Sequence, residues 1–385
     1  MAFLEQYKLM VVITSTVAAM VQLRNRFNGS AAWLHRLLYF LGLDPPPGPK
    51  CKTNIWGWLC FLVMSQAGLF VFIVRSAPHL KGFLINLPAT LPLFDRSIRL
   101  FSVSFIHLIL LLKLGGILDS MCRQLNSVDL ELHRPNLSKV RKVSIAGVIW
   151  TLFVCNSQTI FSMYVESFER RKESFFPFLE TIQQFIRIES YMILDVSVVI
   201  FSASGQLLVT FYQQLVQKTN ADASLTKLFF YSSIATRLSS AVTFLCSQFA
   251  LILLINCIHS FSCLLFFTDA LMSEIAAPDQ RITSFWTSVV LIDGLVRLWL
   301  ICHTVDNISN AAKQSIYSLR KLRDYPSRDI TQTYQRNQVT LSIVEIAGTL
   351  PKFRLYGLVT LSKELLLQVM ETTAAYVLML NELKT

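Results

Sequence analysis

Residues 238–267 decide the fold of this chain, and they read LSSAVTFLCSQFALILLINCIHSFSCLLFF. This run contains no Asp, Glu, Lys or Arg, and residues 55–74 and 143–165 also lack these four residue types. A helix needs about 20 mostly apolar residues to cross the ~30 Å hydrocarbon layer of a membrane, where only internal hydrogen bonding satisfies its backbone. The three runs therefore predict membrane-spanning helices.

Four further apolar runs of similar length contain charged residues. They are residues 100–118 with Lys113, 191–215 with Asp195, 282–305 with Asp293 and Arg297, and 355–380 with Lys363, Glu364 and Glu371. Hydrophobic residues make up 53% of the chain and charged residues 15%, whereas soluble domains carry about 25% charged residues. This excludes a cytosolic enzyme, a disordered protein and a small disulfide scaffold. It predicts an all-α membrane protein with seven transmembrane helices.

The distribution of basic residues predicts the orientation. Segments 1–53, 119–142, 216–237 and 306–354 hold 22 Lys and Arg residues, against 10 in the segments on the opposite side. The positive-inside rule then places the N-terminus in the cytoplasm and the C-terminus outside, and the net charge of +11 needs no nucleic acid as a partner. The N-glycosylation sequons at Asn28, Asn136 and Asn307 all fall on the predicted inner side.

Helical patterns continue beyond the predicted spans. After residue 305, apolar positions recur at helical spacing up to Leu322, so span six is expected to extend into the cytoplasm until Asp324-Tyr325-Pro326. Span two is expected to run on through Leu130. Residues 9–23 are also apolar, and the basic residues that follow them favour an intracellular helix over a secretory signal.

The usual catalytic motifs are absent from the sequence. There is no Gly-rich phosphate loop, G-x-S-x-G, H-E-x-x-H or C-x-x-C, and the six histidines are scattered. We therefore expect neither an enzyme, nor a metal site, nor a cofactor.

The last part of the chain resembles the seventh-helix signature of insect gustatory receptors. That signature has a Gly- and aromatic-rich entry, a Leu-Asp pair, a Leu-Leu pair, Thr-Tyr, five apolar residues and Gln-Phe. Its spacing matches residues 357–383, with Gly357, Leu365-Leu366 and Tyr376 retained. The chain departs from it at five positions: Ser362 for Asp, Ala375 for Thr, Asn381 for the fifth apolar residue, Glu382 for Gln and Leu383 for Phe.

The resemblance implies a taste receptor that acts as a ligand-gated, non-selective cation channel in the plasma membrane of chemosensory neurons. Four subunits, identical or related, would surround one pore lined by the seventh helix. On this interpretation residues 1–53 form a cytoplasmic amphipathic segment, 54–305 the first six helices, 306–351 a cytoplasmic helical anchor, and 352–385 the pore-forming helix.

The implied pore residues form a stripe along the seventh helix. Thr372, Tyr376, Met379 and Leu383 recur at i, i+4, i+7 and i+11, and Met or Leu could form a hydrophobic constriction. Glu382 would give a ring of four carboxylates at the outer mouth. A stripe of this kind is also expected of ordinary helix packing.

Analogy with the family places a pocket for a small-molecule tastant in the outer half of the bundle. The polar and aromatic residues there are Asn156, Gln158, Tyr164, Tyr191, Asp195, His259, Trp286 and Asp293. This mixture suits a sugar as well as a bitter aromatic compound. Asp195 has no opposite charge within one helical turn, whereas Arg297 follows Asp293 by four residues and predicts an intrahelical ion pair that needs no ligand.

Two alternatives remain open on the sequence. The chain could be an odorant-receptor-type channel subunit, because that related family shares the fold. It could also be a secondary transporter that binds a small solute at Asp195 and Asp293, which predicts a broken helix at each carboxylate. A G-protein-coupled receptor is excluded by the predicted orientation.

Overall fold

The computed structural model is helical apart from one short hairpin over the residues that it describes. These are residues 34, 38, 41, 43, 55–80, 87–132, 136–169, 177–221, 227–275, 281–323, 337, 340, 341, 343, 344, 347, 348 and 353–384. The elements are α3 (Ile55–Leu80), α4 (Leu87–Glu131), α5 (Ser138–Glu169), α6 (Pro177–Ala221), α7 (Leu228–Ile275), α8 (Arg281–Arg323), β1 (Arg354–Leu355), β2 (Val359–Thr360) and α10 (Lys363–Lys384).

The chain is a multi-pass membrane protein. Over the described residues, five helices are long and apolar enough to cross a membrane, and these are α4 to α8. The apolar stretch of α3 is shorter, at Gly57–Phe70. Six of the seven predicted spans lie within one helix each, α3 to α8. Seven crossings and the orientation of the termini stay predictions.

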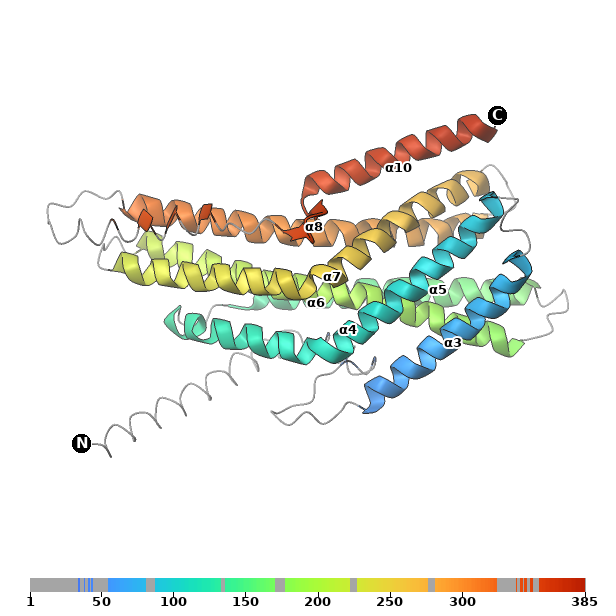
Figure 1. The fold of residues 1–385 in the computed structure, drawn as a ribbon, viewed down its shortest axis with the longest axis horizontal. Coiled ribbons are helices and arrows are strands. Elements are labelled where there is room, and N and C mark those ends of the chain that lie inside the picture. The colour runs from blue at the N-terminus through green and yellow to red at the C-terminus, as the bar shows by residue number, and fades with distance from the viewer. Residues whose placement is uncertain are drawn as a thin grey trace.

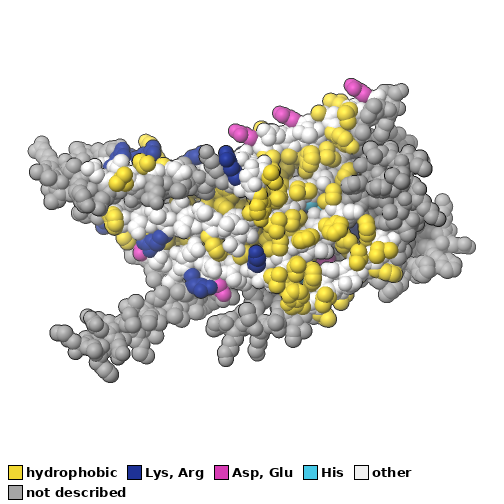
Figure 2. Space-filling model, in the orientation of Figure 1, with side chains coloured by type: hydrophobic (Ala, Val, Ile, Leu, Met, Phe, Trp, Pro, Cys, Tyr) yellow, Lys and Arg dark blue, Asp and Glu magenta, His cyan; other side chains and the backbone are white. Residues whose placement is uncertain are grey.

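The helical bundle is elongated (Figure 1), and on the face shown in Figure 2 the hydrophobic side chains gather mainly on one half, with most Lys and Arg side chains toward the other half. The long helices run from one half into the other. The expected extension of span six is confirmed, because α8 continues without a break to Arg323. Span two likewise continues to Glu131.

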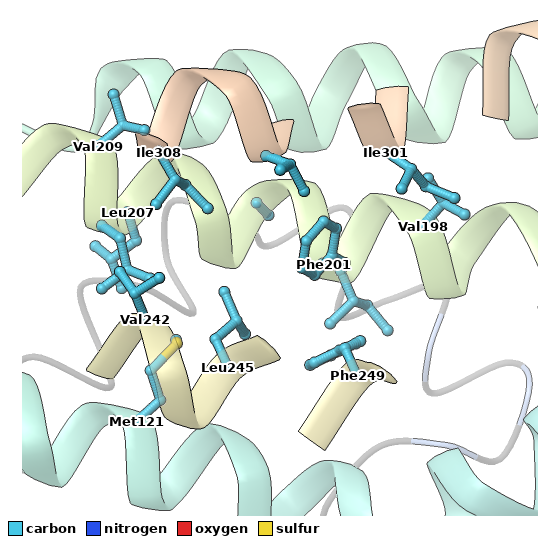
Figure 3. Close-up of a cluster of buried hydrophobic side chains, with 14 of the residues drawn as sticks. Met121, Val198, Phe201, Leu207, Val209, Val242, Leu245, Phe249, Ile301 and Ile308 are labelled. Atoms are coloured by element: carbon cyan, nitrogen blue, oxygen red, sulfur yellow. The ribbon is translucent and has the colours of Figure 1, made fainter. Parts of the chain in front are cut away.

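Helix α6 lies at the centre of the bundle and packs against α3, α4, α5, α7 and α8. All residues from 191 to 205 are buried. Phe201 of α6 contacts Phe249 of α7, with ring centroids 5.6 Å apart, inside an apolar core that α4 and α8 complete (Figure 3). At Gly147 of α5 a Cβ atom would lie 2.5 Å from Val199 Cγ2, so α5 and α6 pack closely there.

The described part of the N-terminal segment belongs to the same core. Leu34, Leu38, Leu41 and Leu43 are buried in it. Residues 9–23, with their expected intracellular helix, lie outside the described residues.

The prediction of one continuous span over residues 355–380 is wrong at its start. Residues 354–360 form an antiparallel hairpin in which Arg354 pairs with Thr360, and the helix begins only at Lys363. Tyr356 and Gly357 have positive φ angles, 50° and 73°, which a helix does not allow and a tight turn requires. The hairpin leads the chain from Phe353, whose ring contacts Phe201, to the base of α10.

Candidate functional site

A buried cluster of three charged side chains joins α6 and α8. Arg297 Nη2 lies 2.9 Å from Asp293 Oδ2, so the predicted intrahelical ion pair is present. Arg297 Nε also lies 3.4 Å from Asp195 Oδ1. The exposed fractions of Asp195, Asp293 and Arg297 are 2%, 0% and 2%. Asp195, which has no oppositely charged residue within one turn of its own helix, thus has a partner in Arg297 on α8.

Two further helices complete this cluster. The indole N–H of Trp150 on α5 donates to Asp293 Oδ1 over 3.0 Å. Arg297 Nη1 lies 3.2 Å from Nδ1 of His259 on α7. Because a guanidinium can only donate, Nδ1 is the acceptor and the His259 ring is neutral in this contact. Helices α5, α6, α7 and α8 therefore converge on one polar network.

The two carboxylates of the cluster are not equivalent. Asp293 accepts a hydrogen bond on one oxygen, and its other oxygen forms the close ion pair with Arg297. Neither oxygen of Asp195 accepts a hydrogen bond from the described residues. The contact of Asp195 with Arg297 is long enough to be an ion pair without being a hydrogen bond.

A group of aromatic side chains surrounds Trp286, which lies two to three turns before Asp293 and Arg297 on α8. Its indole N–H donates to Gln158 Oε1 over 2.7 Å, and the ring of Phe161 stacks on it with centroids 4.6 Å apart. The Arg187 guanidinium lies over the same indole, 5.4 Å from the ring centroid. Gln158 and Trp286, far apart in sequence, are thus direct partners.

Three of the eight predicted ligand-binding residues lie in the charged cluster, and Gln158 and Trp286 contact each other in the aromatic group. Asp195, His259 and Asp293 lie in the charged cluster. Tyr191 is buried one helical turn from Asp195, with the guanidinium of Arg99 5.5 Å from its ring centroid. Asn156 is exposed on α5 and is not part of the cluster. The side chain of Tyr164 lies outside the described residues.

Sequence reasoning missed two residues of this cluster. Arg297 was expected only as the local partner of Asp293, and its contact with Asp195 depends on how α6 and α8 pack. Trp150 was not singled out. An indole N–H in the middle of an apolar span needs an acceptor when it is buried, and this was the signal available for Trp150.

Helix α10 packs on α7 and α8 along one face only. Thr373 and Val377 on that face are 8% exposed each. Of the predicted pore residues, Thr372, Met379 and Glu382 are exposed and Tyr376 is half-buried. The side chain of Leu383 lies outside the described residues.

A second, acidic stripe runs along α10 on the side opposite its packed face. Glu364, Glu371 and Glu382 are all exposed. At 100° per residue these three positions fall within about 20° of one another and about 180° from Thr373. Figure 2 shows acidic side chains along the outer edge of this helix.

Both helices that carry the buried carboxylates are continuous. α6 runs through Asp195 from Pro177 to Ala221, and α8 runs through Asp293 from Arg281 to Arg323. The transporter alternative predicts a broken helix at each carboxylate, so the geometry does not favour it.

This arrangement of long helices is the fold of an insect olfactory receptor. A structure of the olfactory receptor OR5 from Machilis hrabei in complex with eugenol is similar to this chain with a TM-score of 0.64 at 12% identity, over 94% of this chain and 99% of that one. A second OR5 structure gives a TM-score of 0.60 at 11% identity, over 94% and 98%. The resemblance drawn from residues 357–383 is thereby confirmed for the fold. No family model matches the sequence, and no curated protein matches it either.

Proposed function

We propose that this chain is a subunit of a ligand-gated cation channel of the insect chemoreceptor type, and that it serves as a taste receptor. Four subunits, identical or related, surround one pore in the plasma membrane of a chemosensory neuron. The fold similarity supports the chemoreceptor type. The spacing of residues 357–383 supports the gustatory branch.

The exposed carboxylates of α10 carry this proposal. The helix has 22 residues and is therefore about 33 Å long, enough to cross the hydrocarbon layer. Glu371 lies about 12 Å from its first residue, and its side chain is exposed on the subunit. A charged side chain facing lipid near mid-membrane costs about 3 kcal/mol by insertion scales. This face of α10 must therefore meet water or a neighbouring subunit.

An assembly around a central pore meets that requirement, because the acidic stripe, about 90° around α10 from the stripe of Thr372 and Met379, then faces a neighbouring subunit or the water at the pore. With one copy of α10 from each subunit around an axis, Thr372, Tyr376, Met379 and Leu383 line the passage, and Met379 or Leu383 forms a hydrophobic gate that opens by hydration. Glu382 contributes a ring of carboxylates at the outer mouth, which attracts cations and repels anions.

The ligand site in this proposal lies in the half of the bundle where α5, α6, α7 and α8 share polar contacts. The eight residues named for it from the sequence remain candidates, with Asp195, His259 and Asp293 at its inner end and Gln158 and Trp286 nearer its outer end. The eugenol complex shows that OR5, a protein of this fold, binds a small molecule.

Cysteine accessibility along α10 tests the pore. Single Cys substitutions at Thr372 and Met379 are expected to let a charged thiol reagent reduce the current, because both side chains are exposed on the proposed pore face. A Cys at Val377 is the matched control, since that position packs against the subunit. The unmodified chain, with its eight native cysteines, sets the background.

The result that would contradict the proposal is equal modification at all three positions, or none at Thr372 and Met379 in a conducting channel. An odorant-receptor-type channel is the second candidate, because both similar structures are olfactory receptors. Recording the expressed chain against sugars, bitter compounds and volatiles separates the two candidates.

A further inference from the structure

The charged cluster contains two acidic side chains and one basic side chain. Asp195 and Asp293 share one guanidinium, that of Arg297, and all three side chains are at least 98% buried. His259 adds no positive charge while its Nδ1 accepts from Arg297. Ionisable side chains inside a membrane are rare, are almost always paired, and mark functional sites.

Asp195 is the acidic side chain of the cluster that has the fewest partners. Asp293 accepts one hydrogen bond, from the Trp150 indole, and its other oxygen is in ion-pair contact with Arg297 without a hydrogen bond. Asp195 accepts no hydrogen bond from the described residues, and Arg297 is the one cation among them within ion-pair distance of it. A ligand that completes this site must therefore bring a hydrogen-bond donor to Asp195.

These requirements separate the possible ligand classes. A carboxylate or phosphate would add negative charge beside two buried carboxylates. A sugar hydroxyl can donate to Asp195, but it leaves the charge unbalanced. A protonated amine has donors and no acceptor, and its charge-assisted hydrogen bond to a carboxylate is about twice as strong as a neutral one.

Two aromatic side chains lie along the helices from the carboxylates. Tyr191 lies one turn, about 6 Å, from Asp195 along α6, and Trp286 lies about 10 Å from Asp293 along α8. The half-buried guanidinium groups of Arg99 and Arg187 lie over these two rings.

We infer that the ligand of this receptor is a small protonated amine with an aromatic or apolar body, whose ammonium group binds the carboxylate of Asp195 between α6 and α8. This inference rests on the proposed function, because it names the ligand class of that receptor's site. The amine donates hydrogen bonds to Asp195, and its body extends along α6 toward Tyr191.

Binding to the purified full-length protein in lipid nanodiscs tests the inference without any current. The probes are phenethylamine, which is protonated at pH 7.4, and two neutral relatives, phenethyl alcohol and N-acetylphenethylamine. The amine is expected to raise the thermal unfolding midpoint saturably, and the neutral relatives are expected to bind at least tenfold more weakly. This comparison uses the unmodified protein, so it does not depend on a variant that folds.

Asp195→Asn identifies the binding group. It is expected to abolish the stabilisation by phenethylamine, and Asp306→Asn, which removes a carboxylate farther along α8, should retain it. Equal stabilisation by the neutral relatives would overturn the inference, and so would an undiminished response of Asp195→Asn.

The two proposals fail in different ways. Amine binding that depends on Asp195, in a protein that conducts no ions in any recording, would refute the channel and leave the ligand class standing. Currents opened by sugars or other neutral compounds, without binding of amines, would refute the ligand class alone.

Discussion

Replacing Arg297 with Met should be among the most damaging single changes in the bundle. At an effective dielectric constant of about 20, the contacts of 2.9 Å with Asp293 and 3.4 Å with Asp195 correspond to attractions of about 6 and 5 kcal/mol. Much of this is opposed by the cost of burying the ions. Removing one member of a buried pair nevertheless costs about 3–5 kcal/mol, because an uncompensated charge stays behind. We expect Arg297→Met to lower the free energy of unfolding by this amount.

The assay is chemical unfolding of the purified protein in mixed micelles, followed by tryptophan fluorescence. The matched control is the triple variant Asp195→Asn, Asp293→Asn, Arg297→Met, which removes every charge of the cluster and should recover most of the lost stability. If Arg297→Met is as stable as the unmodified protein, Arg297 does not stabilise the bundle by neutralising the two buried carboxylates. A triple variant as unstable as the single one would show that lost packing, and not charge, is responsible.

Three further predictions concern other parts of the chain. Glu382→Gln should weaken block of the current by divalent cations, and recordings with unchanged block and permeation would remove Glu382 from the pore. Asn136 should carry no sugar when the chain is made in insect cells, so a glycosidase-dependent shift in mobility at this site would reverse the topology. Gly147→Ala should cost about 1–3 kcal/mol of stability, because the new Cβ would lie 2.5 Å from Val199 Cγ2. Gly116→Ala is its control, since a Cβ there has no described neighbour within 4 Å, and it should be neutral or stabilising by up to about 1 kcal/mol in the same unfolding assay.

The helices were predictable because their signals are local. The apolar spacing up to Leu322 and the Asp324-Tyr325-Pro326 sequence placed the end of α8 within one residue of Arg323. The pairing of Asp293 with Arg297 follows from a separation of four residues on one helix. Each of these predictions needs only the periodicity of one helix.

The rest of the site could not be predicted in this way. Contacts such as Trp150 with Asp293, or Arg297 with Asp195, depend on the rotation and register of helices that are far apart in sequence. No local pattern records that register. The hairpin was missed for a different reason, because its apolar residues continue the hydrophobic run of the next helix. The signal that could have found it is Gly357, two residues before the β-branched pair Val359-Thr360.

The same hairpin determines how α10 is attached to its subunit. The Leu361 N–H donates to the Phe353 carbonyl over 2.9 Å, and the Lys363 N–H lies 3.3 Å from Asp306 Oδ2 of α8. The ring of Phe353 in turn rests on Phe201, fewer than two turns beyond Asp195 on the same helix. These contacts hold the N-terminal end of α10 to α8 and α6. A small displacement of α6 would therefore be transmitted through Phe201 and Phe353 to the N-terminal end of α10.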